Sequence, residues 1–409
     1  MRDASVGVYV HVPFCERVCP YCDFAVVAAR SLGSVEEARY VDALLRELEA
    51  RHAAFAGRSL ASLYFGGGTP SLLRPASIAR IAGAVQRAFA PGESPSMEAP
   101  IDMEASIEIT LEVNPSTVER ERLPGFLEAG VNRISLGVQS FDDEVLRRLG
   151  RAHRAEEGRH TLLACRNAGF EAVSIDLIFS APAQTLAGFE RDLAEAVAFA
   201  PEHVSTYELT VEPGTPFATA ARRGQLALPA DPDERECRAV SMIEAAEARL
   251  GAAGLGRYEL SNYARPGFES VHNRRYWERL PVLGLGVGAF STDPPAPETP
   301  FGVRRSNRRD LGAYLEEVGA GRSPEAGSPE VLDARTSCCE AVFLALRTAR
   351  GLDARGFAEE FGGPPRHFHG EAIDELVAVG LLAETAEGGD LCLTPRGRLL
   401  SDSVFERFV

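Results

Sequence analysis

Three cysteines near the start of the chain have a spacing that suits a metal cluster. Cys15, Cys19 and Cys22 form the pattern C-x3-C-x2-C, and the valines at alternate positions from residue 6 to residue 12 predict a short strand before them. Three thiolates on a compact loop suit an iron–sulfur cluster or zinc. Structural zinc takes four ligands, and no nearby Cys or His supplies an obvious fourth. We therefore favour a four-iron cluster with one iron free of protein ligands, and keep a zinc knuckle as the alternative.

A second set of polar residues stands where predicted strands end. The glycine segment 66–68, followed by Thr69, would let backbone approach a ligand closely, although it could also be a tight turn. Glu112, Gln139 and Asp176 each lie in or at the end of an apolar segment. Buried carboxylates need partners, so a salt bridge from Glu112 or Asp176 to Arg151 or Arg133 is the structural alternative. Together these side chains indicate one site at a common edge.

The elements that must position these residues alternate along the first 210 residues. Short apolar segments predict strands over 6–12, 60–65, 107–113, 133–139, 172–179 and 203–209, and segments of helical periodicity separate them. This alternation predicts an α/β protein with a parallel sheet, as an open sheet or as a barrel. Residues 91–106 have the composition of an insertion loop.

Composition restricts the class of protein. The 409 residues carry a net charge of -16, which argues against a broad nucleic-acid or anionic membrane surface. No apolar segment approaches the ~20 residues of a membrane span, and no charged segment followed by a long apolar one opens the chain. We expect a cytoplasmic protein without nucleic-acid partners, with membrane contact only through a partner. Thiols stay reduced in that compartment, so the clustered cysteines indicate metal ligands and not a disulfide.

The cysteine loop resembles that of the radical S-adenosylmethionine (SAM) superfamily. In that family SAM chelates the open iron of a [4Fe-4S] cluster, and an electron from the reduced cluster cleaves SAM to a 5'-deoxyadenosyl radical. The segments YVHVPFCERVCPYCDF, YFGGGTPSLL, LEVNP, GVNRISLGVQSFDDEVLRRLGRAH and SIDLIFSAPAQT are similar, in order, to those of the coproporphyrinogen dehydrogenase/HemW branch. The resemblance implies a partial (β/α)6 barrel with a C-terminal winged-helix-like domain. It also implies SAM contacts at the positions Tyr9, Gly67, Gly68, Thr69, Glu112, Gln139, Arg151 and Asp176.

Two functions are open within this branch. The oxidases, which decarboxylate coproporphyrinogen III without oxygen, carry a further Cys two residues after the third, where this chain has Phe24. They also have a longer N-terminal segment than this chain shows. Both differences favour the heme chaperones of the branch, which carry heme to acceptor apoproteins and which, like the oxidases, imply an electron donor. The chain departs from the branch at Ser180-Ala181-Pro182, where the branch usually has Gly-Leu-Pro; this change removes no ligand.

The segment 272–277 matches the HNxxYW motif of the chaperones. A neutral His272 could be an axial ligand of heme iron, and Tyr276 and Trp277 could stack on the porphyrin. Arg274 and Arg275 could pair with propionates or face solvent. The alternative for His272 is a hydrogen-bonded core histidine.

The remaining sequence suggests a division into parts. We expect a barrel over 1–220, a barrel extension over 221–319, a linker over 320–330 and a winged-helix-like domain over 331–409. The glycine segment 284–289 formally fits a dinucleotide fingerprint, but Asp293-Pro294-Pro295 prevents the helix that such a site needs, so we do not expect NAD. DNA binding by the last domain is disfavoured because no basic recognition helix is present.

Overall fold

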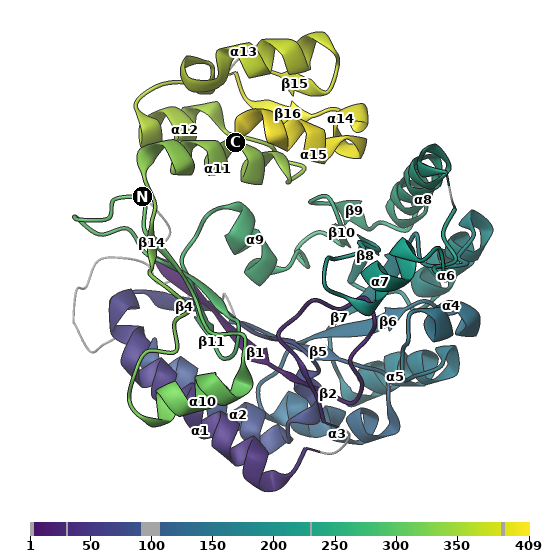
Figure 1. The fold of residues 1–409 in the computed structure, drawn as a ribbon, viewed down its shortest axis with the longest axis vertical. Helices are drawn as coiled ribbons and strands as arrows, with labels where there is room; N and C mark the ends of the chain where they lie inside the picture. Colours follow the sequence, from purple (N-terminus) through teal and green to yellow (C-terminus); the bar gives the residue numbers. More distant parts are fainter. Residues whose placement is uncertain (1–3, 30–31, 91–106, 230, 386–388) are drawn as a thin grey trace.

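Six parallel strands, adjacent in the order in which they occur in the chain, form the centre of the protein (Figure 1). The computed structural model describes residues 4–29, 32–90, 107–229, 231–385 and 389–409, so the expected insertion loop at 91–106 lies outside the described residues. The strands are β1 (Ser5–Val12), β4 (Ser59–Gly67), β5 (Glu108–Val113), β6 (Arg133–Gln139), β7 (Ala172–Phe179) and β8 (His203–Glu208). Each lies within two residues of its predicted position. The prediction of a parallel α/β fold is confirmed.

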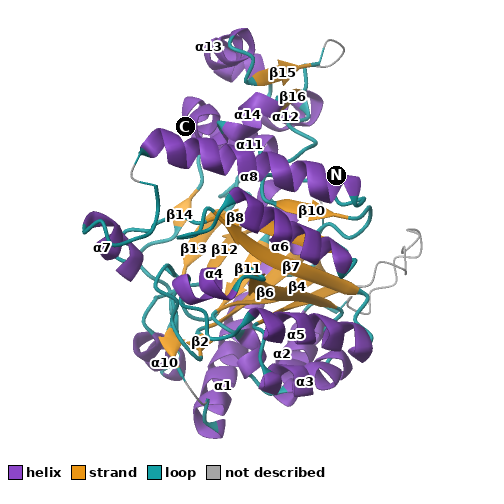
Figure 2. Cartoon of the chain, turned by 90° about the vertical axis from the view of Figure 1, so that its right-hand side faces the viewer, coloured by secondary structure: helices purple, strands orange, loops and turns teal. Residues whose placement is uncertain are grey.

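A helix follows each of these strands and covers the sheet. The long helices are α1 (Ser34–Arg51), α2 (Pro75–Ala88), α3 (Thr117–Glu128), α5 (Ala155–Ala168), α6 (Leu186–Ala198) and α8 (Pro232–Ala252), with the short α4 (Asp143–Arg148) and α7 (Pro216–Arg222) beside them. Figure 2 shows α1, α2, α3 and α5 on one side of the strands. The buried core forms between the two layers, because the strands bury most of their residues and the helices bury one face.

The sheet continues beyond both ends of the six-strand unit and does not close. On one side β11 (Val282–Leu285) pairs parallel with β1, and β12 (Phe290–Asp293), β13 (Val303–Ser306) and β14 (Glu330–Val331) follow antiparallel. On the other side β10 (Asn262–Ala264) and β9 (Gly256–Arg257) pair antiparallel beyond β8. Twelve strands result, in the order β14-β13-β12-β11-β1-β4-β5-β6-β7-β8-β10-β9. The glycine segment 284–289 therefore begins in a strand beside β1, in contact with the cysteine-bearing half of the sheet.

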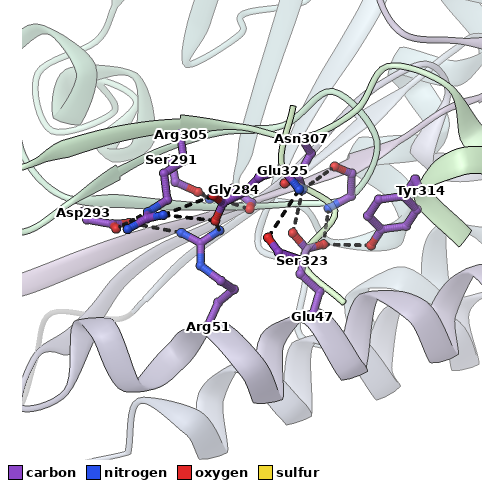
Figure 3. Close-up of polar contacts among 11 residues, drawn as sticks. Glu47, Arg51, Gly284, Ser291, Asp293, Arg305, Asn307, Tyr314, Ser323 and Glu325 are labelled. Atoms are coloured by element: carbon purple, nitrogen blue, oxygen red, sulfur yellow. Dashed lines mark hydrogen bonds and ion pairs between the residues drawn. The ribbon is translucent and has the colours of Figure 1, made fainter. Parts of the chain in front are cut away.

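A buried carboxylate on α1 fixes that glycine segment (Figure 3). Glu47 accepts hydrogen bonds from the backbone N–H of Gly286 (2.8 Å), from Asn307 Nδ2 (2.5 Å) and from Tyr314 Oη (2.7 Å), the last on α10 (Leu311–Gly319). One helical turn further, Arg51 pairs with Asp293 on β12 at 3.1 Å. These contacts join α1 to residues more than 230 positions later in the chain.

The C-terminal residues form a small domain with its own core. It comprises α11 (Ala334–Leu346), α12 (Ala354–Phe361), α13 (Pro365–Ala378), the hairpin β15 (Leu382–Glu384) and β16 (Leu391–Leu393), and the short α14 (Pro395–Leu399) and α15 (Ser401–Phe405). Helix α9 (Val271–Trp277) lies between this domain and the sheet (Figure 1). Among the described helices, none has the length and apolar character needed to cross a bilayer. The expected boundaries at 220, 319 and 330 stay a prediction.

Candidate functional site

The three clustered cysteines lie on a loop that a short strand pair closes. Strand β2 (Phe14–Cys15) pairs parallel with β3 (Val27–Ala28), so the chain between them forms a closed loop carrying Cys19 and Cys22. The Cys22 N–H donates to the Cys19 carbonyl at 3.0 Å. Burial raises the pKa of Cys15 to about 11. The three thiols are unbridged, with Cys15 at the end of β2 and the other two in the loop that follows it.

The glycine segment after β4 packs directly on this loop. The Gly68 N–H donates to the Val12 carbonyl (2.8 Å), and the Thr69 N–H donates to the Phe14 carbonyl (2.7 Å). A Cβ on Gly68 would lie 2.7 Å from the Phe14 oxygen and 2.9 Å from Cys15 Sγ, and Gly67 has φ +108°. Both positions therefore require glycine, one for space and one for conformation.

His11, the nearest histidine before the cysteines, already has a partner on each ring nitrogen. Nδ1 shares a hydrogen bond with Tyr9 Oη (3.1 Å), and Nε2 shares one with the Ala25 carbonyl (2.9 Å). This histidine therefore does not supply the fourth ligand that a zinc knuckle needs. Over the described ranges, no three or more His, Cys, Asp or Glu side chains gather closely enough to hold a single metal ion.

A chain of polar contacts connects the cysteine loop to the ends of β5 and β6. Arg151 Nη1 lies 3.7 Å from Cys19 Sγ, and Nη2 donates to Asn114 Oδ1 (2.5 Å) and to the Gly137 carbonyl (3.0 Å). Asn114 in turn donates to Thr69 Oγ1 at 2.7 Å. The Nε of Arg151 is buried and has no hydrogen-bond partner. A buried, unpartnered guanidinium N–H is a site for an anion such as a carboxylate.

Two carboxylates, Glu112 on β5 and Asp176 on β7, face the inside of the sheet. Glu112 accepts hydrogen bonds from Tyr64 Oη (2.9 Å) and the Gly67 N–H (3.1 Å), and Asp176 accepts from Ser135 Oγ (2.8 Å). Among the described residues neither forms an ion pair, so the expected salt-bridge alternative is not found; Arg133 pairs with Glu108 at 3.6 Å.

Both carboxylates have raised pKa values. Burial raises the pKa of Glu112 to about 7, hydrogen bonds from Tyr64 and Gly67 oppose the rise, and repulsion from Asp176 adds to it. Burial also raises the pKa of Asp176. Arg133 attracts the charge of Asp176, but no cation offsets that of Glu112, so this pair of desolvated carboxylates favours a bound cation.

Gln139 ends β6 in a strained conformation beside Arg151. Its φ of +66° is rare for a residue with a side chain. A Cβ on Gly137 would lie 2.9 Å from Gln139 Nε2 and 3.3 Å from Arg151 Nη2, so these two polar groups converge on the same glycine. Strain of this kind concentrates at ligand sites.

Tyr9 joins the site to the HNxxYW segment on α9. Its ring stacks on Tyr64 (6.1 Å between centroids) and lies 6.2 Å from the His272 ring. His272 is buried, with Nδ1 2.9 Å from Ser62 Oγ and Nε2 3.2 Å from Tyr276 Oη. The interior of the six-strand unit therefore brings the expected SAM positions and His272 into one neighbourhood.

The rest of that segment is divided between two faces of α9. Arg275 is 2% exposed and donates to the carbonyls of Ser5 and Pro281, so the expectation that it pairs with propionates or faces solvent is wrong. Trp277 faces the C-terminal domain, where the Arg347 guanidinium lies 4.7 Å from its ring. A cavity of about 650 Å³ between α9 and the C-terminal domain is lined in part by Trp277 and Arg274.

Two residues that hold the site together were not singled out from the sequence. Asn114 connects Thr69 to Arg151, and Tyr64 holds Glu112. Both belong to segments that carry the family resemblance, YFGGGTP and LEVNP. A polar side chain in each of these segments, an amide in one and a phenol in the other, was the sequence feature that could have indicated them.

The donor set fits a [4Fe-4S] cluster with SAM. Three thiols on one loop, a glycine cradle that a Cβ would fill, two buried carboxylates and a guanidinium with a free buried N–H match an iron cluster beside an amino acid group. A ligand that carries an ammonium and a carboxylate would place the ammonium near the carboxylates of Glu112 and Asp176 and its carboxylate near the guanidinium of Arg151.

Comparisons with known proteins agree with this geometry. The model of the radical SAM superfamily matches residues 9–196, and the model of the HemN C-terminal domain matches residues 332–400. The chain is 32% identical to the heme chaperone HemW of Bacillus subtilis (strain 168), over 98% of this chain and 99% of that protein. It is 37% identical to the heme chaperone HemW of Haemophilus influenzae, over 99% of this chain and 98% of that protein.

Among solved structures, coproporphyrinogen III oxidase (HemN) from Escherichia coli superposes with a TM-score of 0.79 at 24% identity, covering 99% of this chain and 90% of that chain. This likeness shows that the two proteins share a fold, including the C-terminal helical domain. The similarity to the chaperones extends over nearly the whole of both chains, and the chain therefore belongs to the HemW family within the radical SAM superfamily.

Proposed function

We propose that this protein is a heme chaperone: it binds heme, carries a [4Fe-4S] cluster with SAM, and transfers heme to acceptor apoproteins. The observation that carries the proposal is the similarity to curated heme chaperones over nearly the full length of both chains. Phe24 supports it, since the residue at this position, 67% exposed beside the cysteine loop, has no thiol to offer. A cytoplasmic location and an electron donor stay predictions.

The cysteine loop and the strand ends would hold the cluster and SAM. Cys15, Cys19 and Cys22 would each ligate one iron, and the cluster with SAM would supply one-electron chemistry at the SAM sulfonium. The unpartnered Nε–H of Arg151 would bind the SAM carboxylate. Glu112 would accept hydrogen bonds from the SAM ammonium, which replaces the missing cation.

The remaining SAM positions would orient the ligand. Gly67 and Gly68 present backbone without a Cβ, and Thr69 is held by Asn114. Asp176 and Gln139 would receive hydrogen bonds from the ribose and the amino acid part. Tyr9 would limit the site on the side of α9.

Heme would bind on the side of α9 that faces the sheet, next to Tyr9 and Tyr64. Helix α9 carries His272 and Tyr276, and it lies between the sheet and the C-terminal domain (Figure 1). Helix α11 of the C-terminal domain contacts α9. Because this domain would therefore lie next to the bound heme, an acceptor protein would contact it during transfer.

The test is one preparation of reconstituted protein in two anaerobic assays. Incubation with coproporphyrinogen III, SAM and a reductant should leave the substrate unconverted, and titration with heme should show saturable binding. Conversion to the divinyl product would overturn the chaperone function in favour of an oxidase. Iron analysis of the same preparation should give about four irons per chain, and zinc in place of iron would overturn the cluster.

A further inference from the structure

His272 is too enclosed to serve as an iron ligand in this conformation. It is 1% exposed, with Nδ1 2.9 Å from Ser62 Oγ and Nε2 3.2 Å from Tyr276 Oη. The Tyr64 ring stacks on it with centroids 5.1 Å apart. An axial imidazole binds iron through the lone pair of a ring nitrogen, and here both nitrogens already have partners inside the protein.

Tyr276, one helical turn further along α9, has the accessibility that His272 lacks. Its side chain is 38% exposed, and its Oη lies 3.2 Å from His272 Nε2. Its ring meets the His272 ring edge-on at 5.4 Å. The His272 ring in turn lies 6.2 Å from the Tyr9 ring, so Tyr276 is one side chain away from the expected SAM position at Tyr9.

We propose, on the basis of the heme chaperone function above, that Tyr276 coordinates the iron of ferric heme and that His272 is its positioning residue. Tyrosine is an established axial ligand of heme iron. When the Fe–O bond forms, the phenol O–H bond breaks and the proton is released to the buffer, while the iron stays ferric and no electron is transferred. The cationic iron stabilises the phenolate and offsets its desolvation.

The contacts of His272 suit this positioning role. Ser62 on β4 holds Nδ1, so Nε2 is directed at the Tyr276 hydroxyl and the ring is fixed against Tyr64. The packing of α9 on the sheet would therefore set the position of the phenol oxygen. This explains why a histidine and a tyrosine at i and i+4 would act as one unit.

The chain contains a second Ser–His–Tyr set that serves as a matched control. His203 is 3% exposed, with Nδ1 2.8 Å from Ser174 Oγ and Nε2 2.9 Å from Tyr258 Oη. Tyr258 also accepts a hydrogen bond from the Ser270 N–H (3.4 Å), so its hydroxyl is already occupied. Tyr258→Phe removes an equivalent tyrosine–histidine hydrogen bond that does not involve Tyr276, together with the contact to Ser270 at the start of α9, and so measures what loosening of that helix end alone does.

The experiment is a titration of the reconstituted full chain with ferric heme, read by absorbance and by resonance Raman spectroscopy. Wild type should show iron–phenolate vibrations, and Tyr276→Phe should lose them with at least a tenfold weaker Kd. His272→Gln should retain iron–phenolate bands at shifted frequency, and Tyr258→Phe should match wild type. Circular dichroism and iron content confirm that each variant folds and carries its cluster.

Three outcomes would count against the assignment. A Tyr276→Phe spectrum equal to wild type, with heme lost in His272→Gln, would make His272 the ligand. An equal loss in Tyr258→Phe would show general loosening and overturn the role of Tyr276. Absence of heme binding by wild type would overturn both the assignment and the proposed function, which separates the failure of the function from a failure of the ligand assignment alone.

Discussion

Replacing Glu112 by Gln tests whether the negative charge of this side chain, and not only its hydrogen bonding, is needed to bind SAM. The substitution keeps the size of the side chain and an acceptor for Tyr64. It removes the charge that would face the SAM ammonium and the second oxygen, which accepts from the Gly67 N–H. Truncating one partner of a buried, hydrogen-bonded charge pair costs about 2 kcal/mol or more. We therefore expect Glu112→Gln to weaken the SAM Kd roughly thirtyfold or more at pH 7.5, since 1.36 kcal/mol is a factor of ten.

The pH dependence gives the prediction its sharper form. With a pKa of about 7 in the free protein, Glu112 must lose its proton before it can pair with SAM. Lowering the pH from 7.5 to 6 should weaken the wild-type Kd roughly eightfold through this group. The Gln variant lacks this proton and should show only the pH dependence of SAM itself and of other groups.

The stability of the SAM-free protein should fall as the pH rises, whereas SAM binding should become tighter. Because the folded-state pKa lies above the ordinary value of 4.5, the folded state binds more protons than the unfolded state between these values. The contribution of Glu112 to stability is therefore present at low pH and is lost as the pH rises from about 4.5 to 7. At pH 7.5, Glu112→Gln should be more stable than wild type by at most about 3 kcal/mol.

The assays are anaerobic calorimetric titration with SAM at pH 7.5 and pH 6, and denaturant unfolding of the cluster-free protein near pH 5 and at pH 7.5. Equal pH dependence of the SAM Kd in wild type and Glu112→Gln would refute the reasoning. A variant whose stability relative to wild type does not rise between pH 5 and pH 7.5 would refute the unbalanced-carboxylate argument independently.

Three further substitutions test other parts of the structure. Gly68→Ala places a methyl group 2.9 Å from Cys15 Sγ and should reduce iron incorporation by more than half, whereas Gly251→Ala, with open space around it, should keep full iron content. Ser180→Gly relieves a φ of +57° and a buried hydroxyl without a partner, and should raise the free energy of unfolding by about 1 kcal/mol in denaturant titrations; a loss of stability would contradict this. Glu47→Ala leaves the Gly286 N–H and the Tyr314 hydroxyl without an acceptor and removes one of the two hydrogen bonds of Asn307 Nδ2. It should lower the free energy of unfolding by about 3 kcal/mol or more, and an unchanged denaturation midpoint would contradict it.

The sequence by itself determined the local elements and the chemistry at the cysteine loop. Strand periodicity is a local property, so the strands over 133–139 and 172–179 were predicted to the residue. The spacing of the cysteines and the glycine segment likewise depends on neighbouring residues only. The departure at Ser180 was visible in the sequence, and the structure gives its meaning: the position is left-handed, which explains the glycine that the family usually has there.

Only the tertiary structure decided which groups meet. Ser62 and His272 are 210 residues apart and share a hydrogen bond, and no pattern in the sequence specifies such a pair. For the same reason Arg275 was expected at a propionate or in solvent, whereas the fold buries it against β1. The direction of each side chain on α9 depends on what packs against that short helix, and this divides His272 and Trp277 between two faces although they belong to one motif.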